Sequence, residues 1–220
     1  MVYVEGGSFE MGTYGGSNDE KPRHKIVLTG FSIGRYEVTQ AMWTKVMGND
    51  PDVNYFAGCD SCPVEKVSYL SIALFLEKLN ALTGQEFRLP TEAEWEFAAR
   101  GGVHSKSFRY SGGNNINDIA WYELNAGAHT HVVGTKTPNE LGIYDMSGNV
   151  WEWCSDWYAP DYYAHSSMQN PEGPATARFR VIRGGSWYYD KAGLRTTDRD
   201  KGDPALRYGY VGFRLAQSQP

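Results

Sequence analysis

The sequence predicts one α+β domain, residues 1–220, in which two main helices pack against small antiparallel sheets and more than half of the chain forms loops. The length of 220 residues suits one large domain. The helical patterns stop at Gly102. The chain also contains 25 Gly, and 14% of its residues are aromatic, including 7 Trp and 15 Tyr. This combination indicates irregular backbone that aromatic rings hold in place.

The N-terminal third is predicted to contain short strands and one short helix. Strands are expected at residues 9–11, 25–28 and 31–38, of which the last alternates in part between apolar and polar residues. Thr39 is suited to cap a helix that runs through Met47 and ends at Gly48.

The clearest helix is expected between Ser68, as the N-cap, and Gly84. Its apolar residues recur at spacings of three and four, which predicts burial on one side. This stripe consists of Ile72, Phe75, Leu76, Leu79 and Leu82, widened by Leu70, Ala73 and Leu74.

A third helix is expected to start at Thr91, because Thr91-Glu-Ala-Glu94 forms a capping box. Trp95, Ala98 and Ala99 would form its packing face, and Gly101-Gly102 would end it. After Gly102, short strand-like pieces are expected at residues 119–122, 131–134, 151–154, 180–183 and 209–215.

Charge and hydropathy disfavour two kinds of partner. A net charge of −5 argues against a general nucleic-acid-binding surface. No apolar run approaches the ~20 residues that span a bilayer. The chain begins without a basic and then apolar segment, so no signal peptide is predicted within it. We expect an extracellular or cell-surface location if an upstream leader was removed. No sequence pattern indicates an oligomeric state.

The cysteines allow several interpretations. Cys59 and Cys62 have the spacing of half a zinc site or of a redox pair. A zinc site needs a second pair of ligands, and a redox pair would need a strand-to-helix setting, so a local disulfide or two loop thiols are favoured. His129 and His131 could also ligate a metal, but no third ligand lies nearby in sequence, and a polar loop is favoured.

The C-terminal segment, residues 183–215, has an unusual interior. Arg183-Gly-Gly-Ser-Trp187 and Gly212-Phe-Arg-Leu215 are expected to form a rigid frame. The residues between them lack either hydrophobic period but are rich in Tyr, Asp, Arg, Gly and Thr, of which Tyr and Gly in particular are typical of ligand-contacting loops.

Several segments, in a fixed order over nearly the whole chain, resemble the formylglycine-generating enzyme family, also called sulfatase-modifying factors. The matching segments are Gly6-Gly-Ser-Phe-Glu-Met-Gly12, Tyr36-Glu-Val-Thr39, Pro63-Val-Glu65, residues 88–100, residues 139–153, Arg183-Gly-Gly-Ser-Trp187 and Gly212-Phe-Arg-Leu215. The resemblance implies a C-type-lectin-like fold with N- and C-terminal strands near each other.

The resemblance also implies one structural calcium ion in the turn Asp145-Met-Ser-Gly-Asn-Val-Trp-Glu152. Asp145 and Glu152 would supply side-chain oxygens, and Gly148 and Val150 would supply backbone carbonyls. Hard oxygen ligands in irregular geometry suit calcium. A turn held only by hydrogen bonds from Asp145 and Asn149 is the alternative.

Catalysis is not expected. The family's enzymes hold copper with two cysteines five residues apart, because Cu(I) prefers soft thiolates. Here Tyr189 and Leu194 occupy those positions, and no cysteine follows Cys154. No copper is therefore expected. The iron of ergothioneine-pathway relatives is unsupported too, since only His165 lies beyond residue 131.

One branch with this fold, the variable proteins diversified by retroelements, displays different residues on a fixed frame without chemistry. The interior residues belong mostly to the set that such diversification produces; Arg195, Arg199 and Arg207 could belong to it, whereas Lys191 and Lys201 would be fixed. We therefore expect a ligand-binding protein that contacts a protein or a cell-surface molecule. The predicted contact residues are Trp187, Tyr188, Tyr189, Asp190, Leu194, Thr196, Asp198, Asp200, Tyr208 and Tyr210.

Two alternatives remain open from sequence. The first is an oxidoreductase or maturation factor of the formylglycine-generating-enzyme type with altered metal chemistry. The second is a purely structural domain of a larger assembly.

Overall fold

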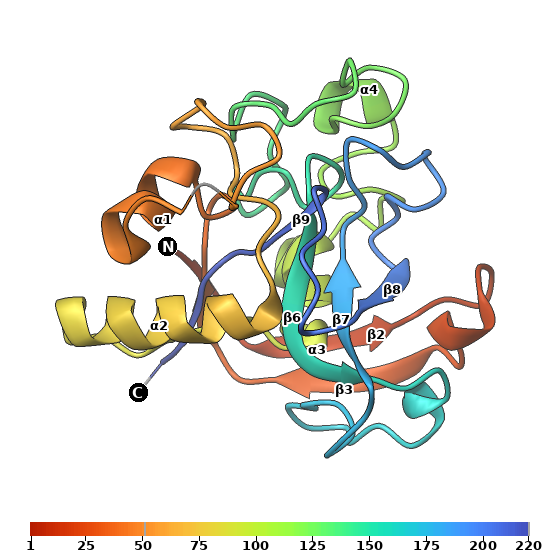
Figure 1. Cartoon of the computed structure of the whole chain (residues 1–220). Coiled ribbons are helices and arrows are strands. Elements are labelled where there is room, and N and C mark those ends of the chain that lie inside the picture. The colour runs from red at the N-terminus through yellow and green to blue at the C-terminus, as the bar shows by residue number, and fades with distance from the viewer. Residues whose placement is uncertain (51, 220) are drawn as a thin grey trace.

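The computed structural model describes residues 1–50 and 52–219, whose regular structure consists of four α-helices, three short 3₁₀ turns and three small sheets (Figure 1). The helices are α1 (Gln40–Met47), α2 (Tyr69–Thr83), α3 (Glu92–Ala99) and α4 (Ile116–Ile119). The 3₁₀ turns are η1 (Asn18–Glu20), η2 (Gly102–His104) and η3 (Tyr162–Ala164). The strands are β1 (Val2–Val4), β2 (Gly7–Met11), β3 (His24–Leu28), β4 (Phe31–Ile33), β5 (Phe87–Arg88), β6 (Trp151–Tyr158), β7 (Phe179–Arg183), β8 (Arg199–Gly202), β9 (Val211–Gly212) and β10 (Ala216–Ser218). The predicted α+β class is confirmed.

The three helix starts follow the predicted capping residues. The side-chain oxygens of Thr39, Ser68 and Thr91 accept hydrogen bonds from backbone amides in the first turns of α1, α2 and α3. The Glu94 carboxylate reaches back to the Thr91 amide at 2.9 Å, which completes the predicted capping box. Gly84 ends α2 in the left-handed conformation, where glycine is favoured.

The two longest predicted helices are buried to different extents. In α2 the stripe is narrower than predicted, because only Ile72 and Phe75 are fully buried, whereas Leu70, Leu74 and Leu82 are exposed. Figure 1 shows the reason, since α2 lies at the outer edge of the molecule and packs on one side. In α3 all eight residues are buried, including three glutamates, because the helix lies between β2, β3, β6 and β7. The prediction of a single packing face for α3 was therefore too narrow.

The sheets join distant parts of the chain. One sheet has the order β1-β4-β10-β5 and places the N- and C-terminal strands on either side of β4, as predicted. A second consists of β2 and β3. The third has the order β8-β7-β6-β9 and contains a parallel pair, β6 with β9, in addition to antiparallel pairs. This parallel pair was not predicted.

Four of the predicted strands are absent or shorter in the described structure. Residues 119–122 and 131–134 form no strand, because side chains satisfy their backbone: the Tyr122 amide donates to Asn125 and the His131 amide donates to Asn149. The strand expected at 31–38 stops at Ile33. The strand expected at 209–215 is reduced to β9. No helix among the described residues is both long and apolar enough to cross a bilayer.

Candidate ligand-binding surface

Seven aromatic side chains from three loops form a continuous surface, which we call the aromatic surface. It consists of Tyr55, Phe56, Trp187, Tyr188, Tyr189, Tyr208 and Tyr210. The rings of Tyr188 and Tyr210 are stacked with their centroids 6.2 Å apart. The Tyr210 centroid also lies 5.7 Å from the ring centroids of both Tyr189 and Tyr208. Phe56 meets Trp187 edge-on at 5.2 Å. Tyr55 and Tyr188 are 67% and 63% exposed, so their rings are available for contact.

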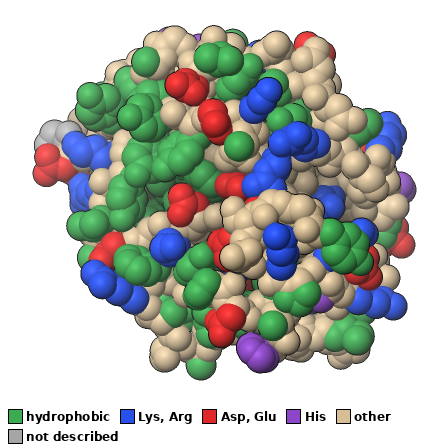
Figure 2. Space-filling view, turned by 90° about the vertical axis from the view of Figure 1, so that its right-hand side faces the viewer, with side chains coloured by type: hydrophobic (Ala, Val, Ile, Leu, Met, Phe, Trp, Pro, Cys, Tyr) green, Lys and Arg blue, Asp and Glu red, His purple; other side chains and the backbone are tan. Residues whose placement is uncertain are grey.

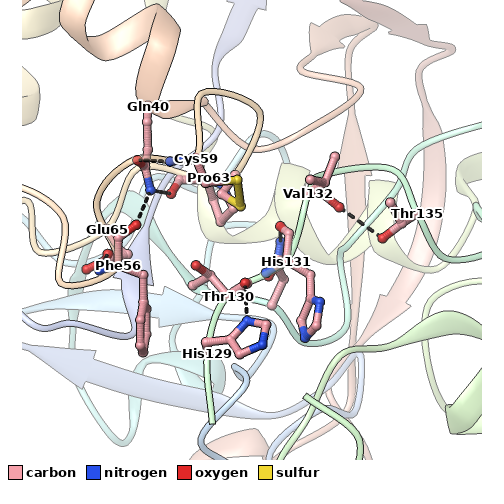
Figure 3. Close-up of a disulfide and its surroundings, with 12 residues drawn as sticks. Gln40, Phe56, Cys59, Pro63, Glu65, His129, Thr130, His131, Val132 and Thr135 are labelled. Carbon is pink, nitrogen blue, oxygen red and sulfur yellow. Dashed lines mark hydrogen bonds between the residues drawn. A yellow bond between two sulfur atoms is a disulfide. The ribbon is translucent and has the colours of Figure 1, made fainter. Parts of the chain in front are cut away.

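The first loop of the aromatic surface was missed by the sequence analysis. Figure 3 shows how residues 54–63 are held. The side-chain amide of Gln40 donates to the carbonyls of Phe56 and Pro63, and its oxygen accepts from the backbone amide of Cys59. The Phe56 amide donates to Glu65 at 2.8 Å. The only sequence signal was the neighbouring Pro63-Val-Glu65 motif, which does not reveal that Tyr55 and Phe56 lie beside residues far along the chain.

The Cys59–Cys62 disulfide closes this loop. It agrees with the favoured interpretation and leaves no thiolates there for zinc. His129 and His131 line a shallow pocket together with the two cysteines. The His129 Nδ1 donates to the Thr130 carbonyl (Figure 3), and the His131 Nε2 donates to the Ala126 carbonyl. They therefore act as members of a polar loop.

The second loop of the aromatic surface is held at the end of β7 by two glycines. Gly184 and Gly185 have φ of +100° and +75°, a region that favours glycine. A Cβ on Gly185 would lie 2.7 Å from the Leu194 side chain and 2.7 Å from the Gly193 carbonyl. The Trp187 amide then donates to the Asn149 carbonyl at 2.9 Å. The predicted frame at residues 183–187 is therefore sterically constrained.

The third loop ends at β9, where the frame closes. The Trp151 amide donates to the Tyr210 carbonyl at 2.9 Å, and the Trp187 indole donates to the Gly209 carbonyl. A Cβ on Gly212 would lie 2.3 Å from the Val64 carbonyl, so only glycine fits. The two ends of the segment thus hold Tyr188 and Tyr210 against each other.

Seven of the ten predicted contact residues lie on or beside the aromatic surface, and three do not. Asp190 is exposed at the margin of the aromatic surface. The charge of Asp200 lies close enough to Tyr189 and Tyr210 to help raise the pKa of both phenols. Leu194 and Thr196 are fully buried, so they cannot contact a ligand directly. The Asp198 carboxylate pairs with Arg195 at 2.5 Å, and its position in an ion-pair network identifies it as structural.

Two arginines that could have been variable are also structural. Arg199 binds both oxygens of the buried Glu92 at 2.6 and 2.8 Å. Arg195 binds both oxygens of the buried Glu20 at 2.6 and 2.8 Å. Removing one member of such a pair would leave the other buried and uncompensated. These side chains therefore belong to the frame.

The two positions that the resemblance assigns to copper ligands, residues 189 and 194, hold a tyrosine and a leucine that pack against other side chains. Leu194 packs among Tyr110, Ile116, Ile119 and Tyr122, and Tyr189 packs edge-on to Trp151 at 5.3 Å. Burial and the neighbouring Tyr210 raise the pKa of the Tyr189 phenol, which keeps it protonated at neutral pH. Among residues 1–50 and 52–219, no three His, Cys, Asp or Glu side chains are placed to hold a metal ion.

The two carboxylates expected to bind calcium already have partners within the protein. Both oxygens of Glu152 accept from the guanidinium of Arg214, at 2.6 and 2.7 Å, and one also accepts from the Trp95 indole at 2.7 Å. Asp145 accepts from the Gly134 amide at 2.7 Å, and its burial raises the pKa of the carboxyl to about 6. The buried cation beside Glu152 is therefore Arg214.

A buried glutamate to which no role was assigned from sequence also holds this turn. Glu37, in the Tyr36-Glu-Val-Thr39 segment, accepts from the Asn149 side chain at 2.7 Å and from the Val150 amide at 3.1 Å. Burial and the nearby Asp145 and Glu152 raise the pKa of its carboxyl well above the ordinary value. The turn is thus held by hydrogen bonds, including those predicted for Asp145 and Asn149.

The fold and this surface define a class: a C-type-lectin-like scaffold whose C-terminal segment presents a Tyr-rich surface. The profile of the sulfatase-modifying factor enzyme 1-like domain matches residues 1–219. The chain therefore belongs to the sulfatase-modifying factor, or formylglycine-generating enzyme, family.

Individual relatives differ in what their names describe. The structure is similar to that of Treponema denticola variable protein 1, with a TM-score of 0.92 and 32% identity over 100% of this chain and 95% of that one. The sequence is 34% identical to the serine/threonine-protein kinase Pkn1 of Chlamydia pneumoniae over 99% of this chain, which spans only 38% of Pkn1. It is 40% identical to the formylglycine-generating enzyme of Streptomyces coelicolor over 59% of this chain and 46% of the enzyme.

Proposed function

We propose that this chain is a non-enzymatic ligand-binding protein that uses the aromatic surface to contact a protein or another cell-surface molecule. The observation that carries the proposal is the aromatic surface itself, seven rings held by a frame in which Leu194 fills the position of a catalytic thiolate. The similarity to a variable protein over the whole chain supports it.

The chemistry of the surface suits a macromolecular ligand. Tyrosine offers a large apolar area and a hydrogen-bonding group while only two torsions are immobilised on binding. Asp190 and Asp200 add polar anchors at the margin. With such a ligand, we propose an extracellular or cell-surface location, on the condition that an upstream leader was removed.

The absence of the family's reaction is tested directly. The purified protein is incubated with a peptide that carries a sulfatase Cys motif, copper and a reductant, and the product is analysed by mass spectrometry. We expect no formylglycine, because no thiolate lies at residues 189 and 194. Formation of formylglycine above a copper-only control would refute the proposal.

The location of the binding surface is tested with a random peptide-display library selected on the wild-type protein. Enriched peptides should lose binding to Tyr188→Ala/Tyr210→Ala, since truncation of central aromatic contacts costs about 2 kcal/mol or more. They should retain binding to Tyr3→Ala, a control at an exposed tyrosine on β1. Equal binding to all three proteins would place the binding surface elsewhere.

A finer proposal is that the surface is diversified by a retroelement. A reverse transcriptase gene and a near-identical template repeat beside this gene would support it, with substitutions concentrated at the aromatic surface and absent at Arg195 and Arg199. A genome with neither element would refute it.

An enzyme with altered metal chemistry is the second candidate, favoured by the match to formylglycine-generating enzymes over 59% of the chain. Metal analysis of the purified protein distinguishes the two. Stoichiometric iron or copper would favour the enzyme, and neither metal is expected for a binding protein.

A further inference from the structure

A second hollow, separate from the aromatic surface, lies where the loop after β2 faces the C-terminal segment. It has a volume of about 690 Å³ and is lined in part by residues 12–16, 107–109, 192 and 195–197. The loop after β2 lies on the right-hand side of Figure 1, which faces the viewer in Figure 2. Near the centre of that face, Lys and Arg side chains lie among Asp and Glu side chains. We call this hollow the arginine pocket, and it shares no residue with the aromatic surface.

The charged residues of the arginine pocket are all cationic. Arg23, Arg100, Arg109 and Arg195 line it, and no Asp or Glu is among its described lining residues. This concentration of guanidinium groups is unusual in a chain whose net charge is −5. A concave surface lined by charges of one sign focuses the electrostatic potential, and here that potential attracts an anion.

Two of these arginines are held from behind by buried carboxylates. Glu20 binds Arg195 through both oxygens, Asp198 binds it at 2.5 Å, and Glu96 binds Arg100 at 2.9 Å. Glu20 and Glu96 are fully buried, so they fix the guanidinium groups from the interior side. Both guanidinium groups are therefore held in place before any ligand arrives, which lowers the entropic cost of binding. All five N–H donors of Arg195 are used by Glu20, Asp198, Thr197 and Ala192, so Arg195 forms part of the wall and leaves hydrogen bonding of a ligand to Arg23, Arg100 and Arg109.

The other two arginines have little compensation. Arg23 lies 3.9 Å from the exposed Glu10, the outer limit of an ion pair. Arg109 is exposed, with its guanidinium 5.6 Å from the centre of the Tyr110 ring, and no carboxylate of the described residues pairs with it. These two groups contribute positive charge that the protein itself does not neutralise.

The backbone of the loop is shaped to expose this site. Gly12 and Gly16 have φ of +81° and +93°, and a Cβ on either would lie within 2.5 Å of an oxygen of Glu20. The loop thus folds tightly over Glu20, which orients Arg195. Tyr14, 78% exposed, and the half-buried Phe108 add apolar rings beside the cations.

We infer that the arginine pocket binds a small organic anion that carries a phosphate or sulfate group on a flat apolar portion. Guanidinium groups bind tetrahedral oxyanions through paired N–H donors. The rings of Tyr14 and Phe108 would contact the apolar portion. The volume lies in the range of small-molecule sites, roughly 300–1,000 Å³. This inference does not depend on the ligand of the aromatic surface.

Calorimetric titration at low salt tests the inference with four probes: inorganic phosphate, sulfate, phenyl phosphate and phenol. We expect phenyl phosphate to bind more tightly than phosphate, because it adds the ring contact, and phenol not to bind. A preference between phosphate and sulfate would identify the group. Absence of binding by both phosphate and phenyl phosphate in the millimolar range would overturn the inference, and so would binding of phenol equal to that of phenyl phosphate.

Matched variants place the site. Arg23→Gln/Arg109→Gln should weaken phenyl phosphate binding about tenfold or more, as expected for the loss of charge-assisted hydrogen bonds. Both side chains are exposed, so folding should be unaffected, as thermal unfolding would verify. Arg35→Gln, at another exposed arginine, should bind like the wild type. Equal affinity of the double variant and the wild type would overturn the inference. Amide NMR shifts of the wild type provide an independent readout, which must locate phenyl phosphate at residues 12–16.

Discussion

Leu194 is the residue at which a ligand-contact role and a packing role make opposite predictions. It occupies the position of a catalytic cysteine, it was predicted to contact a ligand, and it is fully buried in the structure. Its side chain packs beneath Gly185 and among Tyr110, Ile116 and Ile119. We therefore predict that Leu194→Ala destabilises the protein.

The magnitude follows from the packing. Truncation of a fully buried leucine to alanine costs about 3–5 kcal/mol where the cavity cannot collapse. Collapse is hindered here, because the Leu194 carbonyl accepts from Ser147 at 2.8 Å and Gly185 is sterically constrained. For a chain of this size the loss corresponds to a decrease in Tm of about 10 °C.

Urea unfolding followed by tryptophan fluorescence measures the free energy of unfolding. Tyr188→Ala is the control, since its ring is 63% exposed and its loss should change the free energy by less than about 0.5 kcal/mol. Unchanged stability of Leu194→Ala, or a larger loss for Tyr188→Ala, would refute the packing argument and return Leu194 to the ligand-contact set.

Three further predictions test the frame. Gly185→Ala should lower the free energy of unfolding by about 1–3 kcal/mol, because φ is +75° and the new methyl group would meet the Leu194 side chain; a neutral effect in urea unfolding would contradict this. Arg214→Met should lower the free energy of unfolding by about 3–5 kcal/mol, because it leaves the buried Glu152 carboxylate uncompensated. EDTA should leave the Tm of the wild type unchanged. A large decrease in Tm with EDTA, reversed by calcium, would support calcium binding by Asp145, Gly148, Val150 and Glu152. Burial raises the pKa of Asp198 to about 6, above its unfolded value, so ionisation of this carboxyl between about pH 4 and 6 reduces the stability of the wild type. The free energy of unfolding of Asp198→Asn, relative to that of the wild type, should therefore rise over this interval and stay constant above it. A difference that does not change with pH would contradict the assignment.

Local sequence patterns determined the parts of the fold that depend on neighbouring residues. The caps at Thr39, Ser68 and Thr91 were predictable because a side-chain oxygen and an amide three residues away satisfy each other within one turn. The absence of cysteine at residues 189 and 194 could also be read from the sequence, since the nearby Gly-Gly-Ser motif fixes these positions in the chain.

Only the tertiary structure decided which residues form the surface. Tyr55 and Phe56 join residues 187–210 through contacts between segments more than 130 residues apart, which no local pattern reports. Leu194, Arg195 and Arg199 lie within a segment whose composition suggests display, yet packing and buried carboxylates turn them inward. The sequence by itself thus determined the family and the absence of cysteine at residues 189 and 194, whereas burial and long-range ion pairs determined which side chains remain exposed.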